Sequence, residues 1–183
     1  MTIPSSSDRA RPDAPHADER ASDPAMLDAS IASAFEVRVQ QQPIDIQSEI
    51  MPITRNPNVG AIVNFLGVVR HSGDVDDVVA LELEHYPGMT EQSFSSIVDE
   101  AIARWRLEAV KIVHRVGRVA LGDAVVLVVV AAPHRGAAFD ACEFLMDFLK
   151  AHAPLWKKEI RRDGALKWVE AKAGDERSML RWG

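Results

Sequence analysis

Residues 124–152 read AVVLVVVAAPHRGAAFDACEFLMDFLKAH, and this stretch decides the fold. Its first nine residues, Ala124 to Ala132, form a valine-rich apolar run that predicts a buried strand and is too short to span a bilayer. From about Gly136 to His152, apolar side chains recur at helical spacing, and Pro154 ends the helix. The apolar stripe of this helix is predicted to comprise Phe139, Cys142, Leu145, Met146 and Leu149.

A β-hairpin is predicted directly after this helix. Asp163-Gly164 separates an alternating run from Leu155 to Arg162 from a second run from Ala165 to Ala171. An Asp-Gly step between two such runs is a strong signal for a hairpin turn.

Upstream, further strands and a second long helix are predicted. Alternating or apolar runs indicate strands at 35–40, 61–69, 79–86 and 109–119, the last interrupted at Gly117, and a short helix at 44–54. Thr90 is the predicted N-cap of the long helix, with Glu91 in its first turn. The stripe of that helix is Phe94, Ile97, Val98, Ala101, Ile102 and Trp105. The pattern predicts an α+β fold: a mixed, mostly antiparallel sheet of about seven strands, two main amphipathic helices and a C-terminal hairpin.

Residues 1–33 differ in composition from the remainder. They contain Ser5-Ser6-Ser7, four prolines and few large apolar residues, which is typical of a disordered extension. We therefore expect one domain over residues 34–183.

The overall composition excludes several function classes. The chain of 183 residues has a net charge of −6 and a pI of about 5.5, which argues against nucleic acid as a partner. The single cysteine, Cys142, allows no internal disulfide and fits a reducing, cytoplasmic location. No zinc, nucleotide-loop or serine-hydrolase motif is present, so we expect no metal and no bound cofactor, and no membrane association.

The junction Pro133-His134-Arg135-Gly136 is the first candidate for chemistry. It joins the buried strand to a helix start, where backbone N–H groups favour anions, and His134 and Arg135 add side-chain donors. The alternative is that Arg135 is a solvated loop residue and His134 a local cap, and the motif alone does not separate the two.

Lys150 and Arg70 are candidates at the ends of other elements. Lys150 lies near the end of the helix, where a surface lysine is favoured by the helix dipole in any case. Arg70 ends an apolar strand and begins a polar loop, a position where binding residues often occur but where exposed arginines are common too.

The strand after Pro154 carries three further candidates. Strand side chains alternate between faces, so Lys158 shares a face with Trp156 and Ile160. One possibility is that Trp156 and Ile160 point into the core. Lys157 and Glu159 then point elsewhere together, and Glu159 can hold Lys157 in place or tune its pKa. The alternative is an ordinary cross-strand ion pair on the surface.

Other reactive residue types are interpreted as structural. Cys142 falls on the apolar stripe of its helix and is expected in the core rather than as a nucleophile. His85 and His114 lie in strand patterns and are expected to be structural as well.

Several stretches of the chain form a recognisable set. Two of them, EHYPGM at 84–89 and APLWKKE at 153–159, are specific in combination. The others are FLGVVR at 65–70, IVHRVG at 112–117, APHR at 132–135, FLMDFLK at 144–150 and WVEA at 168–171. Together they resemble one family, the large, catalytic subunit of molybdopterin synthase, from about residue 34 to near the C-terminus.

The resemblance implies a reaction, partners and a fold of the α/β-hammerhead type. The family converts cyclic pyranopterin monophosphate into molybdopterin by inserting two sulfurs as a dithiolene. The sulfur comes from a thiocarboxylate on the C-terminal glycine of a small ubiquitin-like subunit, and the usual assembly is a homodimer of large subunits with one small subunit at each end, a heterotetramer.

The resemblance also assigns roles to residues by position. Some family members have a lysine two residues before Arg70, where this chain has Val68, so that contact is not expected here. Lys150, Lys157 and Glu159 are expected to be catalytic, and Arg70, His134, Arg135 and Lys158 to bind substrate. Lys150 either accepts the partner's acyl group as an amine or acts as an acid or base.

Two other functions remain open on the sequence. The chain can be a non-catalytic binding module for a ubiquitin-like sulfur carrier, or a different phosphate-handling enzyme on the same scaffold. Binding a carrier tail alone does not need Lys150, Lys157 and Glu159 together, so this basic set favours the enzyme over the module.

Overall fold

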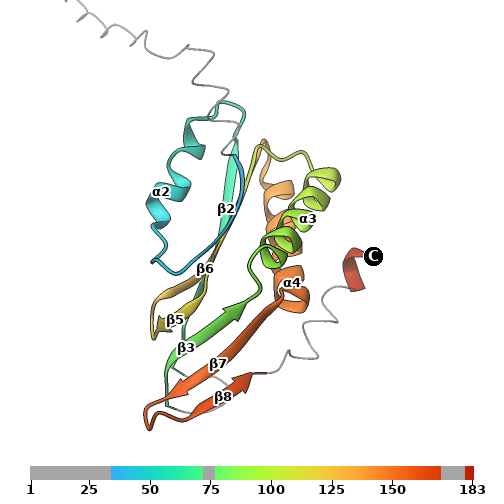
Figure 1. Cartoon of the computed structure of the whole chain (residues 1–183). Helices are drawn as coiled ribbons and strands as arrows, with labels where there is room; N and C mark the ends of the chain where they lie inside the picture. The colour runs from blue at the N-terminus through green and yellow to red at the C-terminus, as the bar shows by residue number, and fades with distance from the viewer. Residues whose placement is uncertain (1–33, 72–76, 170–179) are drawn as a thin grey trace, which may run out of the picture.

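The structure, a computed structural model, describes residues 34–71, 77–169 and 180–183 (Figure 1). The predicted disordered extension lies outside these ranges, as do the end of the predicted hairpin and most of the loop after Arg70. No helix in the described ranges is long and apolar enough to cross a membrane. The elements are β1 (Phe35–Gln40), α2 (Ile46–Ile50), η1 (Ile53–Arg55), β2 (Ala61–Val68), β3 (Val78–His85), α3 (Met89–Arg104), β4 (Ala109–Arg115), β5 (Gly117–Ala120), β6 (Ala124–Ala132), α4 (Arg135–His152), β7 (Leu155–Arg161), β8 (Leu166–Val169) and η2 (Leu180–Trp182).

The strands form two four-stranded sheets rather than the single sheet that the sequence predicted. Sheet A has the order β1-β4-β6-β2, and sheet B has the order β5-β3-β7-β8. Strands β1 and β4 run parallel, and every other neighbouring pair in the two sheets is antiparallel. The α+β class and the mostly antiparallel pairing are therefore confirmed.

Gly117 explains why there are two sheets. The strand predicted over 109–119 is interrupted at this residue, whose φ of 73° is in the left-handed region that favours glycine. Before the interruption, β4 pairs with β1 and β6 in sheet A; after it, β5 pairs with β3 in sheet B. The chain changes sheets where its backbone turns.

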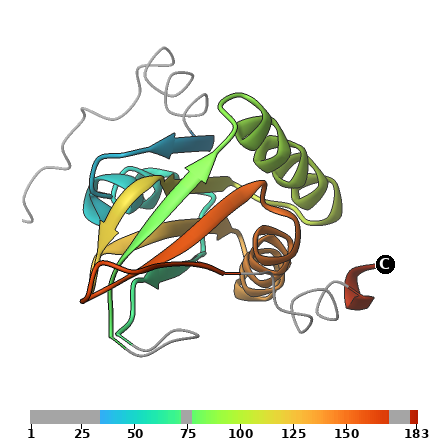
Figure 2. The ribbon, with the colours of Figure 1, turned by 60° about the horizontal axis from the view of Figure 1, so that its bottom comes forward.

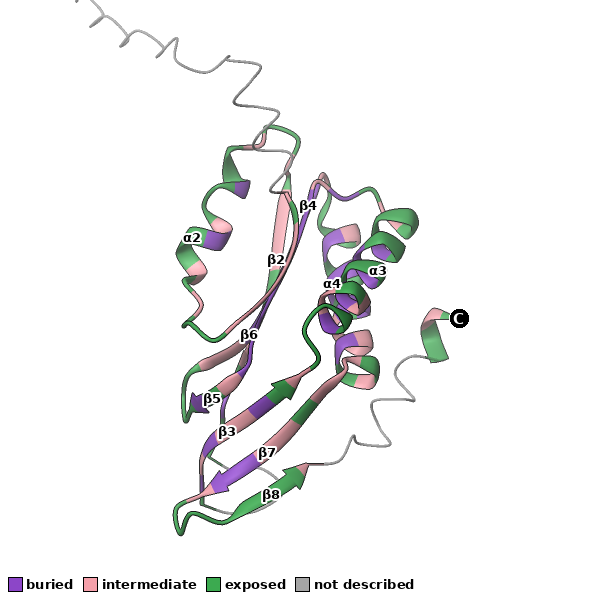
Figure 3. Cartoon of the chain, in the orientation of Figure 1, coloured by how far each residue is buried: buried purple, intermediate pink, exposed green. Residues whose placement is uncertain are grey.

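Sheet A lies between helical layers, with α2 on one side and α3 and α4 on the other (Figure 1). Figure 2 shows β3 and β7 of sheet B side by side, in green and orange. Strand β6 is buried on both faces, and its residues Leu127 to Ala132 have no exposed surface, which confirms the predicted buried strand (Figure 3). The core is continuous from β6 into α3 and α4.

Helix α4 begins and ends as predicted, but its apolar stripe is rotated. Phe139 is 61% exposed, so its predicted place in the core is wrong. The small residues Ala138 and Ala141 are fully buried instead. Because alanines let a helix approach a sheet closely, α4 packs on β2 and β6 through them and turns the large ring outward.

Helix α3 begins at Met89, with Gly88 and not Thr90 at its N-cap. The backbone N–H of Gly88 donates to Glu91 Oε2 at 2.7 Å, which confirms the place of Glu91 in the first turn. The Thr90 hydroxyl donates back to the carbonyl of Tyr86 at 3.1 Å and is buried. Gly88 takes the N-cap position because the turn there has a φ of 84°, which glycine adopts readily.

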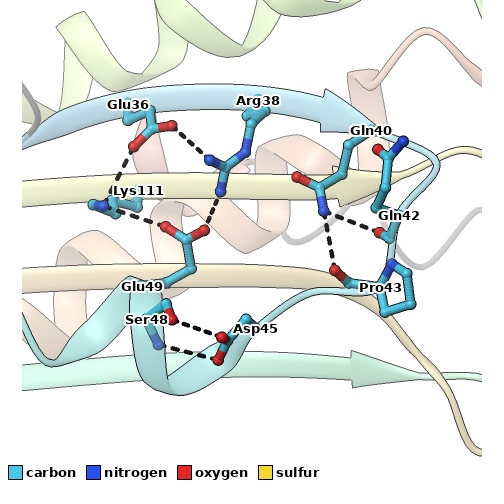
Figure 4. A network of polar contacts seen from close by, with 9 residues as sticks. All are labelled: Glu36, Arg38, Gln40, Gln42, Pro43, Asp45, Ser48, Glu49 and Lys111. Carbon is cyan, nitrogen blue, oxygen red and sulfur yellow. Dashed lines mark hydrogen bonds and ion pairs between the residues drawn. The ribbon is translucent and has the colours of Figure 1, made fainter.

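A buried polar network connects α2 to sheet A (Figure 4). The Lys111 ammonium, on β4, lies 3.2 Å from Glu49 of α2 and 3.3 Å from Glu36 of β1. Arg38 pairs with both of these carboxylates, at 3.1 Å from Glu36. Each buried charge therefore has an opposite partner, as burial requires.

Candidate active site

A cavity of about 620 Å³ lies where sheet A, sheet B and the last turns of α4 meet. This volume is typical of small-molecule sites. Most of its lining is apolar and comes from β2, β3, β6 and α4. The ionisable residues that line it are Arg70, His114, Lys150, Lys157 and Glu159. Three cations around a largely apolar space favour an organic anion as ligand.

Strand β7 carries Lys157 and Glu159 into the cavity together. The two residues share a face because strand side chains alternate, and the antiparallel register places Lys157 opposite Leu83 and Glu159 opposite Leu81. Both leucines line the same cavity. Glu159 is buried, with 4% of its surface exposed. The predicted pairing of these two side chains on one face is therefore present.

Trp156 does not take the core orientation that was considered for it. Ile160 is buried, but Trp156 is 41% exposed and packs edge-on against Tyr86, with ring centroids 4.9 Å apart. The inner face of β7 borders the cavity, so the face with Lys157 turns inward and the tryptophan turns outward.

Lys158 lies on this outer face and does not line the cavity. Its ammonium forms an ion pair with Glu84 on β3 and lies 4.2 Å from the centre of the Trp168 ring on β8. The structure therefore separates Lys158 from Lys157 and Glu159.

Arg70 and Lys150 lie at the rim of the cavity and are exposed. Arg70 follows β2, and Lys150 is in the last turn of α4. A β-bulge between Gly67 and Val68 changes the direction of the strand just before Arg70. A Cβ at Gly67 would lie 2.7 Å from a methyl carbon of Val126, so the strand requires a glycine there.

His134 and Arg135 lie at the opposite end of α4 and do not line the cavity. His134 is the N-cap residue, which confirms its predicted place at the helix start, and both side chains are exposed. Arg135 and Lys150 are 15 residues apart in the helix, a separation of about 22 Å at the rise of an α-helix. One copy of the chain therefore does not bring all the predicted cations together.

His114 is a cavity residue that sequence reasoning assigned to a structural role only. It lies on β4, is 9% exposed, and its Nδ1 is 2.8 Å from the backbone oxygen of Arg115. Burial lowers the pKa of His114 to about 4; the hydrogen bond to Arg115 opposes this shift and the charge of His85 adds to it. The sequence signal was the histidine itself, in a strand where it directly follows the apolar pair Ile112 and Val113.

Cys142 is buried in the core, as predicted. Burial, with a smaller contribution from Glu143, raises the pKa of its thiol to about 11, so the group is protonated at neutral pH. Within residues 34–71, 77–169 and 180–183, no group of three or more His, Cys, Asp or Glu side chains could hold a metal ion.

Comparisons with known proteins agree on one family. Residues 39–152 match the family model described as MoaE protein. A molybdopterin synthase catalytic subunit from Ralstonia nicotianae is 49% identical over 148 residues, covering 80% of this chain and 84% of the relative.

Solved structures lead to the same family. A molybdopterin biosynthesis MoaE protein from Burkholderia ambifaria has a TM-score of 0.67 at 47% identity, covering 80% of this chain and 97% of that one. The crystal structure of molybdopterin synthase from Staphylococcus aureus has a TM-score of 0.66 at 35% identity, covering 72% and 95%.

Proposed function

This chain belongs to the MoaE protein family, and we propose that it is the catalytic subunit of a molybdopterin synthase, an enzyme of molybdenum cofactor biosynthesis. The proposed reaction transfers sulfur from the C-terminal thiocarboxylate of a small ubiquitin-like subunit to cyclic pyranopterin monophosphate. The observation that carries this proposal is the cavity, in which Arg70, Lys150 and Lys157 surround a mostly apolar space beside Glu159.

The cavity suits both anionic reactants. Arginine and lysine donate charge-assisted hydrogen bonds to phosphate and carboxylate oxygens, which explains a cationic site in a chain of net charge −6. The apolar lining from β2 and β6 suits the face of a fused heterocycle. We assign Arg70, at the rim, to the substrate's anionic oxygens.

The transfer itself needs an acyl group to leave the sulfur. In the proposed sequence, the thiocarboxylate sulfur attacks a substrate carbon and displaces an oxygen from it, which leaves protonated as water or as a freed phosphate oxygen. The acyl C–S bond of the resulting thioester is then cleaved at the carbonyl carbon, so that the sulfur stays on the substrate and the acyl group passes to the attacking nucleophile. Lys150 either attacks that carbon as an amine or acts as the acid or base for an attacking water. Lys157 stabilises the negative charge that develops on the carbonyl oxygen, and Glu159 orients Lys157.

We propose that a second copy of the chain supplies His134 and Arg135. These residues lie at the far end of α4 from the cavity, so they reach a cavity only if a homodimer places one helix start at the partner's site. The backbone N–H groups at that helix start favour the substrate phosphate. Lys158, on the outer face of sheet B, is left outside the proposed site.

The proposal extends to the cell compartment and the domain. A buried, unoxidised cysteine suits an enzyme of the reducing cytoplasm. The catalytic domain is proposed to span residues 34–183, after an N-terminal extension of residues 1–33.

Lys150→Ala tests the function in an assay with thiocarboxylated small subunit and cyclic pyranopterin monophosphate. We expect loss of dithiolene product by about a thousandfold or more, because the residue acts on the reacting atoms, with binding of the small subunit unchanged. Arg106→Ala is the control, since it removes a positive charge from a side chain that is 83% exposed. Near-normal turnover by Lys150→Ala would remove Lys150 from the mechanism.

The same assay separates the enzyme from the alternative, a non-catalytic module that only binds the sulfur carrier. A module would bind the small subunit with wild-type affinity and form no product. Product formation by the wild-type pair excludes that alternative.

A further inference from the structure

His114 lies on β4 of sheet A and lines the cavity of the proposed site. It lies on the same face of β4 as Val110 and Ile112, which pack toward α3 and α4, and it lines the cavity with Lys150 and Lys157. Its ring lies 6.1 Å from the ring of Phe94 on α3, between centroids. The imidazole is therefore held by its strand and by an aromatic neighbour while one part of it opens to the cavity.

The hydrogen bond to the backbone fixes which nitrogen carries the proton. A carbonyl oxygen only accepts, so the contact of 2.8 Å to Arg115 requires a hydrogen on Nδ1. Burial keeps the ring neutral, since it lowers the pKa of His114 to about 4. In a neutral imidazole whose Nδ1 carries the hydrogen, Nε2 has a lone pair and accepts hydrogen bonds.

This acceptor differs from its neighbours in the cavity. Arg70, Lys150 and Lys157 have donors only. Glu159 also has acceptor oxygens, but it lies on the same strand face as Lys157. His114 thus contributes an uncharged acceptor with a fixed tautomer to a lining that is otherwise apolar or charged among the described residues.

We propose that Nε2 of His114 accepts a hydrogen bond from a ring N–H group of the heterocyclic substrate and so sets the orientation of the heterocycle against Lys150 and Lys157. The inference rests on the proposed function and adds a specificity-determining residue to it. A substrate rich in N–H groups gains a buried partner there, and an analogue that lacks the donor would leave Nε2 unsatisfied.

A matched pair of variants tests the proposal. In His114→Asn, the shorter amide takes the place of Nδ1 and keeps the hydrogen bond to Arg115, but it leaves the Nε2 position empty. In His114→Gln, the longer amide restores an acceptor near Nε2. We expect His114→Asn to raise KM for cyclic pyranopterin monophosphate about tenfold with little change in kcat, and His114→Gln to stay within about threefold of wild type.

The opposite result would overturn the proposal. If His114 served the fold alone, His114→Asn would behave as wild type and His114→Gln would be impaired in both KM and thermal unfolding. Affinity for the small subunit, measured in parallel, is expected to be unchanged in both variants; a loss confined to that affinity would place the hydrogen bond on the partner's tail and contradict the proposal. His152→Asn, on an exposed histidine of α4, is the control.

A measurement on the wild-type chain covers the case in which a variant does not fold. Nitrogen-15 NMR of labelled histidine reports hydrogen bonding at Nε2 directly, and we expect its resonance to shift when cyclic pyranopterin monophosphate is added. If saturating substrate leaves the resonance unshifted and the wild-type chain still turns over normally, the inference is overturned and the proposed function stands. A wild-type chain that neither binds nor converts the substrate would overturn both.

Discussion

Cys142 distinguishes two ways in which a protein can transfer sulfur. A carrier cysteine must be accessible and ionised, whereas this thiol is buried and its pKa is raised to about 11. We therefore expect Cys142→Ala to keep sulfur transfer within about twofold of wild type and to lower the free energy of unfolding by about 1 kcal/mol. Turnover with thiocarboxylated small subunit, together with urea unfolding, provides the check. A variant that folds normally but has lost turnover would show that the thiol takes part.

His114 predicts a dependence of stability on pH. Its pKa is lowered from 6.5 to about 4, so between these values the unfolded chain binds a proton that the folded chain does not. This contribution to stability is complete above pH 6.5 and is lost as the pH falls toward 4, where the loss reaches about 3 kcal/mol.

Comparing the pH dependence of the free energy of unfolding of wild type and His114→Asn separates the contribution of His114 from that of other titrating groups. Urea unfolding of both proteins at several pH values is the measurement, and wild type is expected to lose more stability than the variant on acidification. Parallel curves for the two proteins would contradict the pKa assigned to His114.

At the residue scale, the sequence predicted some site residues better than others. Alternation along a strand placed Lys157 and Glu159 on one face without knowledge of the fold. It did not show which face of the strand points inward. Trp156 suggested its own face, whereas the face with Lys157 and Glu159 borders the cavity. His114 was interpreted as structural because a histidine in an apolar strand gives no sign of what lies opposite, and that depends on how sheet B packs on sheet A.

At the element scale, the link between α2 and sheet A depends on Glu49. This carboxylate accepts from Lys111 at 3.2 Å and pairs with Arg38. We expect Glu49→Ala to lower the free energy of unfolding by about 3 kcal/mol, because it leaves a buried ammonium with one remaining partner, Glu36.

Two comparisons in urea unfolding make this test specific. Asp45→Ala, which removes the exposed N-cap of α2 that accepts from Ser48, is expected to cost clearly less than Glu49→Ala. The double variant Glu49→Leu/Lys111→Met is expected to recover most of the loss, since no uncompensated charge stays buried. A cost for Glu49→Ala similar to that for Asp45→Ala would contradict this account of the network.

The elements themselves were predictable where the signal was local. The Asp163-Gly164 hairpin is present, with Gly164 at φ of 85°, because a two-residue turn depends on its own residues. The rotation of α4 was not predictable, because Phe139 and Ala138 both fit a helical stripe and the sheet decides which one approaches it. Thr90 was likewise predicted as the N-cap, but Gly88 takes that position because it adopts the positive φ of the turn.

At the scale of the whole molecule, the predicted cations divide between two places. Lys150 lines the cavity and Arg135 begins the same helix at its other end. The sequence placed the two residues at opposite ends of one predicted helix, but it did not show at which end the cavity lies. The division into two sheets was also not predictable from the sequence. It depends on which strands pair with β4 before Gly117 and with β5 after it.

The separation predicts complementation between inactive variants. Lys150→Ala and Arg135→Ala are each expected to be inactive alone, but a mixed dimer has one site with both residues intact. Random exchange of equal amounts should restore about a quarter of wild-type activity, because half of the dimers are mixed and each has one working site of two. Mixtures of two Lys150→Ala samples are the control. Mixed dimers with no activity would show that each site uses a single copy.

The central claim is that the cavity moves sulfur from the small subunit to the cyclic phosphopterin. The most direct test is intact-protein mass spectrometry of the thiocarboxylated small subunit after one turnover with this chain and the cyclic substrate, with product measured in parallel. We expect two small subunits to lose their thiocarboxylate sulfur for each dithiolene formed, as free carboxylate if water attacks or as an adduct on Lys150 if the amine attacks. We expect none to change when Lys150→Ala replaces the wild-type chain. Small subunits that keep their thiocarboxylate while product accumulates, or lose it without product, would contradict the account.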